Sequence, residues 1–452
     1  MIRQSDHLSA AGSVGESSRS VLLEDVQLIA APDANPVVCD LYVESGLIAE
    51  IDESRSRPQP ADIRLDCSAH VALPGFANLH VHCRPQRALS DGMPVPVWHR
   101  RVDLISRHMN EDDSYAGGLT AIGELLLSGV TSCVIMTRHF AGAARAAEVL
   151  GARAAVIPLA GDGGGVERGD LDDLGSALDD VAGYSDPGGR VQMWPGFDSP
   201  LTTSPDGMRK VAQVSDNRQL GIHTHMAETR YEVDTFRSKH GVSEPEALRD
   251  AGLLGERTLL AHCNWLEDQE IDVLAETDTA VVHNPTSNMR FASGICRVPD
   301  LRDSEIRVAL GTDGMLSGYQ LNMFGAMRTA AMLHRIANGD AAIFNSTDLL
   351  NMVTTVPASI LGTGAGRLTV GAEADMAVVN MTGIHLQPYR RGPDNDPDLL
   401  NLIVWCAQPS DVQHVLCSGE LVVHDRRLSR VANEEILRHA QESDARLRPL
   451  IR

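Results

Sequence analysis

Two pairs of histidines, each separated by one residue, are the first feature of this chain that could do chemistry. His80 and His82 lie in the run FANLHVH, and His223 and His225 lie in GIHTHMAE. In a β-strand, residues i and i+2 point to the same face, so both imidazoles of a pair can reach one metal ion. A single such pair among 17 histidines is weak evidence, and the interpretation rests on the combination.

Two further ligand-type residues end other short apolar runs. His262 lies near the end of TLLAHC, and Asp313 lies near the end of RVALGTDG. Neutral imidazoles together with a carboxylate form a donor set that suits Zn²⁺, and Fe²⁺ is compatible with the same donors. Because all of these side chains fall at the ends of predicted strands, we interpret them as one metal site and not as unrelated core histidines.

The segments that carry these residues alternate with helical stretches. Between Pro74 and Gly366, short strand-like runs are each followed by polar or glycine-rich residues and then by an Ala/Leu-rich stretch. This rhythm predicts parallel strands with helical crossovers, and seven or eight such units suit a (β/α)8 barrel better than an open sheet. In such barrels the chemistry lies at the C-terminal ends of the strands, where the histidines and carboxylates of this chain fall.

Composition and charge narrow the range of partners. The 452 residues are 43% hydrophobic and 22% charged, as in an ordinary soluble globular protein. A formal net charge of -22 repels phosphate backbones and anionic lipid, so we expect a small-molecule substrate and neither nucleic acid nor membrane as partner. The 8 cysteines are scattered and the N-terminus lacks the apolar core of a signal peptide, which indicates free thiols and a cytoplasmic protein.

Five motifs carry a resemblance to a known family: PGFANLHVH, HTHMAET, LAHC, VVHNPTSNMRFASG and ALGTDG. In this order they resemble the amidohydrolase superfamily, and most closely its aminohydrolase and chlorohydrolase branch, which includes S-adenosylhomocysteine deaminases, guanine deaminase and triazine hydrolases. The resemblance runs from about Leu22 to Leu428. It includes the strand-like segments at both ends of the chain, which look like the small β-sandwich that the family builds from its two termini.

Together, the pattern and the resemblance predict four parts of the chain. The start is rich in Ser, Gly and charge and is expected to be disordered, and a helical tail from Asn433 to Leu447 is expected near the end. The predicted parts are a disordered N-terminus (1–19), a β-sandwich (20–73 together with 367–430), a metal-dependent barrel (74–366) and a C-terminal helix (431–452).

The resemblance also implies roles for individual residues. Glu228 matches the family's proton-shuttling acid, His262 matches the histidine that orients the attacking water and polarises the substrate, and His223 takes a structural role beside the site. The metal ligands that it implies are His80, His82, His225 and Asp313. Asp313 is also expected to accept a proton from the attacking water.

The lysine count favours a single ion. Binuclear members of the superfamily bridge two ions with a carboxylated lysine at a strand end. This chain has only two lysines, Lys210 and Lys239, and both lie in predicted helical stretches. We therefore expect one divalent ion, Zn²⁺ or Fe²⁺. Relatives are often dimers or tetramers, so a homo-oligomer is expected by analogy.

The expected pocket departs from that of the nucleoside-handling relatives. Where those relatives carry a ribose-binding glutamate, this chain has Ser106 or Arg107, and where they carry a purine-contacting histidine, GFDSP places Asp198. Asp198 would favour a substrate with N–H donors or positive charge, although it also fits the pattern of a solvated turn aspartate. Trp98 is a candidate for stacking on a flat ring, with simple packing as the alternative.

Two loops supply further pocket candidates. Arg84 and Gln86 follow the HVH motif closely enough to face the pocket, and a surface role stays open for both. In the family, the loop HNPTSNMRFASG lines the substrate pocket, which makes His283 and Asn288 candidates for substrate binding. Asn284 in the same loop fits a turn cluster.

These residues lead us to expect hydrolytic deamination of a small aminated N-heterocycle, a free base and not a nucleoside. A divalent ion lowers the pKa of water to about 7 and so provides hydroxide for attack on the C–NH2 carbon. Glu228 can then move protons to a ring nitrogen and to the leaving ammonia. The alternative is removal of chloride or an alkylamine from a triazine- or urea-like substrate. A non-catalytic barrel would lack a ligand or the acid, and none is missing.

Overall fold

Eight parallel strands form the centre of the computed structural model, which describes residues 19–56, 60–87, 92–159, 162, 174–175, 178, 189–318, 320–392 and 397–450. The strands form two four-stranded sheets in which each strand pairs with the next one along the chain. The first sheet contains β6 (Phe76–Val81), β7 (Val130–Thr137), β8 (Arg153–Pro158) and β9 (Val191–Met193). The second contains β10 (Ile222–Met226), β11 (Thr258–His262), β12 (Ala280–His283) and β13 (Val308–Leu310).

The two sheets approach each other at both edges. Gly196, just after β9, forms a parallel bridge with His223 of β10. At the other edge, the Asp313 N–H donates to the His80 carbonyl of β6 at 3.0 Å. The result is a TIM-barrel-like α/β arrangement, as the alternating sequence pattern predicted.

Side chains that point alternately to the two faces of the central strands form two separate apolar layers. On β7, Val134 and Met136 belong to an inner cluster, whereas Cys133 and Ile135 belong to a larger outer cluster that contacts the helices. Since successive side chains of a strand point to opposite faces, one run of apolar residues fills both layers. This explains why the strands read as continuous apolar runs.

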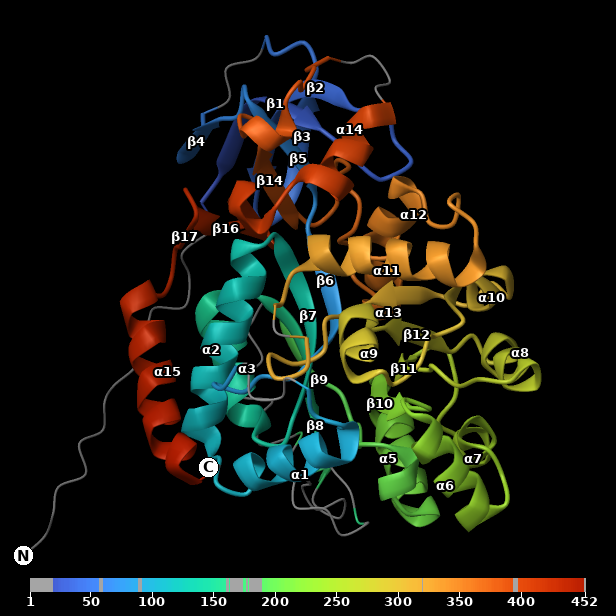
Figure 1. Ribbon diagram of the computed structural model, residues 1–452. Helices are drawn as coiled ribbons and strands as arrows, with labels where there is room; N and C mark the ends of the chain where they lie inside the picture. The colour runs from blue at the N-terminus through green and yellow to red at the C-terminus, as the bar shows by residue number, and fades with distance from the viewer. Residues whose placement is uncertain are drawn as a thin grey trace, which may run out of the picture.

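Helices follow most of these strands and cover the outside of the sheets (Figure 1). None of the helices within the described ranges is long and apolar enough to cross a membrane. The helices around the central strands are α1 (Val95–Ser106), α2 (Glu111–Leu127), α3 (Phe140–Leu150), α5 (Pro205–Arg218), α6 (Arg230–His240), α7 (Glu244–Asp250), α8 (Asp268–Glu276), α9 (Pro285–Phe291), α10 (Val298–Asp303), α11 (Met323–Asn338), α12 (Ser346–Asn351) and α13 (Thr355–Leu361).

The strands at the two ends of the chain form one nine-stranded, mainly antiparallel sheet. Its centre is the antiparallel pair of β5 and β14, which joins N-terminal to C-terminal strands (Figure 1, blue and orange). Its strands are β1 (Val21–Leu28), β2 (Val37–Glu44), β3 (Leu47–Asp52), β4 (Ile63–Asp66), β5 (His70–Pro74), β14 (Met376–Asn380), β15 (Val412–Cys417), β16 (Glu420–His424) and β17 (Arg427–Leu428). Strands from both ends of the chain therefore share one sheet.

Two more helices belong to the C-terminal region, α14 (Pro397–Asn401) and α15 (Asn433–Leu447). The bounds of α15 are those expected from the sequence. This helix lies alongside α2 (Figure 1), where Ser443 Oγ donates to Asp113 Oδ1 at 2.6 Å. All eight cysteines are free, and all except the half-buried Cys406 are buried.

A buried arginine connects the central strands to the terminal sheet. Arg153, on β8, donates from Nε to Asp375 Oδ2 at 3.1 Å and from a guanidinium nitrogen to Ser418 Oγ at 2.7 Å. The Asp375 side chain is fully buried, and Arg153 is only 8% exposed. Burial works against the charged form, but the Asp375 carboxylate raises the pKa of Arg153 above its usual value. The pair is therefore charged and complementary.

We predict that Arg153→Met strongly destabilises the protein. The substitution removes one partner of a buried ion pair and leaves the Asp375 charge uncompensated, which costs about 3–5 kcal/mol. A urea titration followed by tryptophan fluorescence measures this loss. The control is Arg367→Met, because the Arg367–Asp33 pair, with side chains 53% and 59% exposed, is expected to contribute less than about 1 kcal/mol. Equal stability losses in the two variants would contradict the prediction.

Candidate active site

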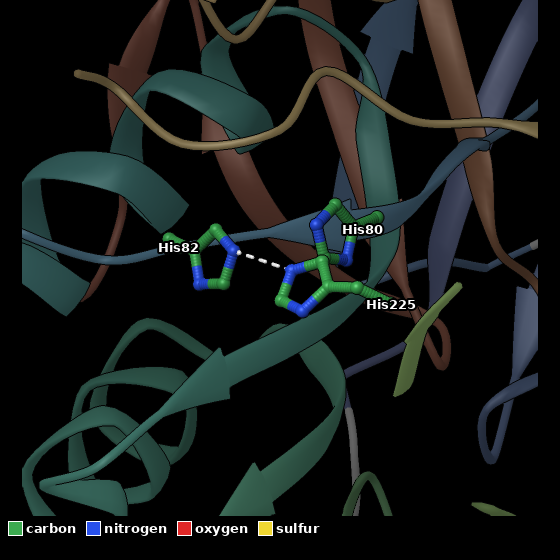
Figure 2. A group of neighbouring side chains, drawn as sticks. All are labelled: His80, His82 and His225. Atoms are coloured by element: carbon green, nitrogen blue, oxygen red, sulfur yellow. Dashed lines mark hydrogen bonds between the residues drawn. The ribbon is translucent and has the colours of Figure 1, made fainter. Parts of the chain in front are cut away.

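The ends of four central strands bring the candidate ligands together. Figure 2 shows His80, from β6, and His82, which follows β6 directly, beside His225, from β10. The Nε2 atoms of His82 and His225 are 3.2 Å apart. Asp313 Oδ1 lies 3.8 Å from His80 Nε2 and 3.6 Å from His82 Nε2. Two groups that share His80 have ligand atoms close enough to hold one ion: His80 with His82 and His225, and His80 with Asp313 and His262, the last residue of β11.

Two glycines allow the ALGTDG segment to approach the HVH motif. A Cβ on Gly311 would lie 2.4 Å from Asn284 Oδ1, and a Cβ on Gly314 would lie 2.9 Å from the Cβ of His82. Asp313 itself has a φ of 59°, in the left-handed region that residues other than glycine rarely adopt. The glycines of GTDG thus allow two backbone segments to approach closely, which places the Asp313 carboxylate beside the histidines.

Backbone carbonyls determine which nitrogen of two of these rings carries the proton. His82 Nδ1 lies 2.8 Å from the Met136 carbonyl, and His225 Nδ1 lies 2.6 Å from the Asp198 carbonyl. A carbonyl oxygen can only accept, so each Nδ1 must be the donor. In the neutral ring, Nε2 then has a free lone pair, and in both rings this nitrogen faces the other ligands.

His80 reaches the same state through a second histidine. His223 Nδ1 donates to the Leu259 carbonyl at 2.8 Å, so its Nε2 is an acceptor. His80 Nδ1 donates to this His223 Nε2 at 2.8 Å, which leaves the lone pair on His80 Nε2. That nitrogen is buried and has no hydrogen-bond partner among the described residues. His223 therefore holds His80 in the tautomer that a metal ligand needs, which is a structural role of the kind expected.

The rings of His80, His82 and His223 are neutral at physiological pH. Burial lowers the pKa of His82 and of His223 to about 3, and it lowers the pKa of His80 well below the usual value. Metal binding requires neutral imidazole. Burial therefore favours metal binding over protonation at His80 and His82.

Asp313 is held as a carboxylate. Ser287 Oγ donates to its Oδ2 and the Gly314 N–H to its Oδ1, each at 2.6 Å. Burial alone would raise the pKa of Asp313, but the facing rings of His82 and His262, together with these hydrogen bonds, lower it below the usual value. The site thus combines imidazole lone pairs with one negative charge.

This arrangement fits one divalent ion. With their protons on Nδ1, the Nε2 atoms of His82 and His225 have no hydrogen to share across the 3.2 Å that the dashed line in Figure 2 marks. Two nitrogens bound to one Zn²⁺ at about 2.0–2.1 Å and a tetrahedral angle are about 3.3–3.4 Å apart. Converging lone pairs beside a carboxylate repel one another unless a cation lies between them. The donor set therefore fits a metal ion.

A second histidine group, in the terminal sheet, is not a metal site, because its protons are placed differently. His414, His424 and Asp425 also lie close together. The Asp425 N–H donates to His414 Nδ1 at 3.3 Å, so the proton of the neutral His414 ring is on Nε2. This Nε2 is the nitrogen that faces the Asp425 carboxylate, at 3.8 Å. A protonated nitrogen cannot bind a metal, and we assign no metal to this group.

Glu228 lies in the loop that connects β10 to α6. Its Oε1 accepts from Ser293 Oγ at 3.3 Å, and its N–H donates to Glu232 Oε2 at 3.0 Å. The preceding Ala227 has a φ of 49°, and its N–H donates to Glu244 Oε2 at 2.6 Å. This loop is thus held by carboxylates on the elements that follow it, and it directs Glu228 into the same cavity as the metal ligands.

Two asparagines connect His262 to the Glu228 loop. His262 Nδ1 donates to Asn288 Oδ1 at 2.8 Å, Asn288 Nδ2 donates to Asn264 Oδ1 at 2.6 Å, and Asn264 Nδ2 donates to the Glu228 carbonyl at 2.8 Å. The first bond places the lone pair of His262 on Nε2. Asn288 is fully buried and orients His262 from behind.

A cavity of about 580 Å³ opens over this group. Its size suits a small organic molecule. Trp98 and Phe291 form one aromatic part of its wall, with ring centroids 5.0 Å apart. The chemically important lining residues are Arg84, Trp98, Asp198, His225, Glu228, Glu232, His262, Trp265, Phe291, Ser293 and Asp313.

The remaining candidates from the sequence lie elsewhere. His283 is fully buried, with Nε2 3.3 Å from His334 Nε2, and it lies outside the described lining of the cavity. Gln86 is buried at 1% exposure, and its amide has no hydrogen-bond partner among the described residues. Ser106 is buried and Arg107 is exposed, and neither is part of that lining.

Sequence reasoning missed several residues that contact the site. Asn264 follows LAHC directly and Glu232 follows HMAE by four residues, so closeness in sequence to the motifs could have found both. Ser287 lies within the motif VVHNPTSNMRFASG, but its contact with Asp313 joins two different strand ends. No spacing in the sequence indicates that contact.

Comparison with known proteins agrees with this geometry. A 5'-deoxyadenosine deaminase of Methanothermobacter thermautotrophicus is 33% identical over 412 residues, covering 90% of this chain and 94% of the relative. A 5-methylthioadenosine/S-adenosylhomocysteine deaminase of Syntrophomonas wolfei is 33% identical over 436 residues, covering 94% and 99%.

A solved structure shares the fold. The adenosine deaminase of Xanthomonas campestris, determined with bound zinc, superposes with a TM-score of 0.86 at 24% identity and covers 95% of this chain and 98% of that protein. The sequence model of the amidohydrolase family matches residues 71–422. As the motifs and the metal-type cluster indicated, this chain belongs to the amidohydrolase family.

Proposed function

We propose that this protein is a metal-dependent deaminase that hydrolyses the C–NH2 bond of a small aminated N-heterocycle and releases ammonia. The observation that carries the proposal is the convergence of three imidazole lone pairs and the Asp313 carboxylate in one cavity with Glu228. The names of the relatives, which are deaminases of adenosine derivatives, support it.

In this proposal one divalent ion is held by His80, His82, His225 and Asp313. Zinc suits these donors, and the zinc in the Xanthomonas structure supports that choice, while Fe²⁺ is compatible with the same set. Both lysines of the chain lie on helices, Lys210 on α5 and Lys239 on α6, which supports a single ion. When bound, a divalent ion lowers the pKa of water and makes hydroxide available at neutral pH.

The side chains around the ion then handle the protons. Asp313 accepts the proton of the attacking water, and Glu228 delivers a proton to the ring nitrogen beside the C–NH2 carbon. Protonation of that nitrogen lets the carbon accept the hydroxide oxygen. The other proton of the attacking water, passed from the new C–OH group through Glu228, would convert the amino group into ammonia as the C–N bond breaks and the C=O bond forms. His262, held by Asn288, presents Nε2 toward the reacting atoms.

The cavity wall suits a flat ring without a sugar. Trp98 and Phe291 offer aromatic faces for stacking, and Asp198 offers a carboxylate to N–H donors. The positions that would correspond to a ribose-binding acid, Ser106 and Arg107, lie away from the described lining. We therefore propose a free base as substrate, although the relatives are named for nucleosides.

The architecture is part of the same proposal. We infer that the two central sheets close into a (β/α)8 barrel over residues 74–366 and that the terminal sheet folds as a β-sandwich from 20–73 and 367–430. The contacts at both sheet edges and the strand pair of β5 and β14 support this division. The segment 1–19 falls almost entirely outside the described residues.

The proposed activity predicts ammonia release in a defined screen. Zinc-loaded protein is incubated with aminopyrimidines, aminopurines, pterins and aminotriazines, with the matching nucleosides, and with chloro- and alkylamino-triazines, and ammonia, chloride and alkylamine are each measured. We expect ammonia from at least one free base, at a higher rate than from its nucleoside. If chloride or an alkylamine is released without ammonia, the activity is removal of that leaving group and not deamination. If no product forms in any arm, the proposal is refuted.

Glu228→Gln should lose most of the turnover and keep the metal. The amide preserves the size of the side chain but cannot carry the proton, and general acid–base catalysis contributes about 10²–10⁴-fold. The initial rate of ammonia release and the metal content by elemental analysis are the measurements. Turnover within about threefold of the unmodified enzyme would remove Glu228 from its proposed role.

His225→Ala should reduce the bound metal as well as the activity. The substitution removes one of the converging lone pairs, and the site then has too few donors to retain its ion during dialysis. Elemental analysis after dialysis measures the metal content. The matched control is His424→Ala in the excluded histidine group, which should retain about one ion per chain. Normal metal content in His225→Ala would contradict the ligand assignment.

A further inference from the structure

We propose that Glu232 is a specificity-determining residue that selects heterocycles carrying a cationic group, such as an amidinium or guanidinium, beside the reacting amino group. This inference rests on the proposed function, since it concerns the substrate of the same cavity. Glu232 lies in the first turn of α6 and lines the cavity together with Glu228 and Asp198.

The start of α6 engages only one oxygen of Glu232. Thr229 is the N-cap residue, and its Oγ1 accepts the Glu232 N–H at 3.1 Å. In a capping box, the glutamate at this position returns to the N–H of the N-cap residue. Here Glu232 Oε2 instead accepts the N–H of the preceding residue, Glu228, at 3.0 Å. A carboxylate has two oxygens, so the other one remains available on the cavity side.

No ion pair joins Glu232 to an arginine or lysine within the described ranges, although Arg84 and Arg230 line the same cavity. Arg230 is closest in sequence, but 61% of its side chain is exposed and it pairs with Asp234 at 3.0 Å. Its guanidinium also lies over the Trp265 ring, 5.7 Å from the ring centroid. Arg237, on the same helix, pairs with Glu267 and Glu270. An ionised group that is partly removed from water without a counter-ion is unfavourable.

The charges around Glu232 in the cavity wall also favour a cationic ligand. Burial raises the pKa of Glu232, and the charges of Glu228 and Asp198 raise it further, while the hydrogen bond from the Glu228 N–H and the nearby His225 lower it. A cation in the cavity would relieve both effects, since an opposite charge favours the ionised carboxylate. The Trp98 ring lines the same space and can also contact a planar cation, whereas Arg230 and Arg290 already lie over the rings of Trp265 and Phe291.

The charge of the whole protein supports the same class of ligand. The formal net charge of -22 produces a field that attracts cations and repels anions. A heterocycle with an additional basic nitrogen would be drawn to the molecule and then held by Glu232. An anionic substrate would meet repulsion at both stages.

Glu244 provides a matched control in the same loop. Its Oε2 accepts the Ala227 N–H at 2.6 Å, one residue before the N–H that Glu232 binds. It is 3% exposed and lies outside the described lining of the cavity. Burial raises the pKa of Glu244 well above the usual value, so it is closer to a neutral acid. Glu244→Gln therefore changes a loop-holding carboxyl without changing the cavity wall.

The experiment compares two flat ligands of nearly equal shape, the cation benzamidine and the neutral benzamide. Isothermal titration calorimetry with zinc-loaded protein measures both affinities. We expect the unmodified protein to bind benzamidine at least about tenfold more tightly, which corresponds to about 1.4 kcal/mol. Glu232→Gln should reduce this preference to less than about threefold, because glutamine still accepts the Glu228 N–H but carries no charge. Glu244→Gln should keep the full preference.

Several outcomes overturn the proposal. These are equal affinity of the unmodified protein for the two ligands, no detectable binding of benzamidine, a preference that Glu232→Gln retains, and an equal loss in Glu244→Gln. The comparison on the unmodified protein decides the first two even if a variant fails to fold. The readout is binding and not ammonia, so a protein that selects benzamidine but deaminates nothing would refute the proposed function and leave this inference standing.

Discussion

The site depends above all on the hydrogen bonds that place the imidazole protons. Three backbone carbonyls accept the Nδ1 protons. The Met136 carbonyl, on β7, accepts from His82, and the Asp198 carbonyl, after β9, accepts from His225. The Leu259 carbonyl, on β11, accepts from His223. In His82 and His225 the Nε2 lone pair is thereby left for a metal ion, whereas His223 Nε2 accepts from His80 Nδ1 and so leaves the lone pair on His80 Nε2. The strand register thus sets the chemistry, because a shift of one residue would turn the histidines to the other face.

Burial and backbone strain act in the same direction as those hydrogen bonds. Burial among the central strands also lowers the pKa of His80, His82 and His223, so these rings stay neutral, and those of His80 and His82 are available to a cation. The left-handed conformations of His262 and Asp313 turn the chain sharply at the strand ends and aim these side chains inward. Such strain persists because the surrounding strands and helices hold it in place.

Elements outside the central strands also contribute to the site. α6 begins directly after the Glu228 loop, and its first turn holds that loop through Glu232 while presenting a carboxylate to the cavity. The terminal sheet is tied to β8 through Arg153 and Asp375, and β8 in turn pairs with β7, whose Met136 carbonyl orients His82. Catalytic geometry and stability are therefore coupled through shared strands.

The sequence by itself determined the family, the fold class and the candidate ligands. The period-two spacing in HVH and HTH is a local pattern, and so is the position of His262 and Asp313 at strand ends. Local patterns can be read directly from the sequence. Only the tertiary structure decided the tautomers, the link from His262 through Asn288 to the Glu228 loop, and the place of Glu232 on the cavity wall. It also placed His283 behind the site. These features depend on contacts between segments distant in sequence, whose distances no spacing encodes.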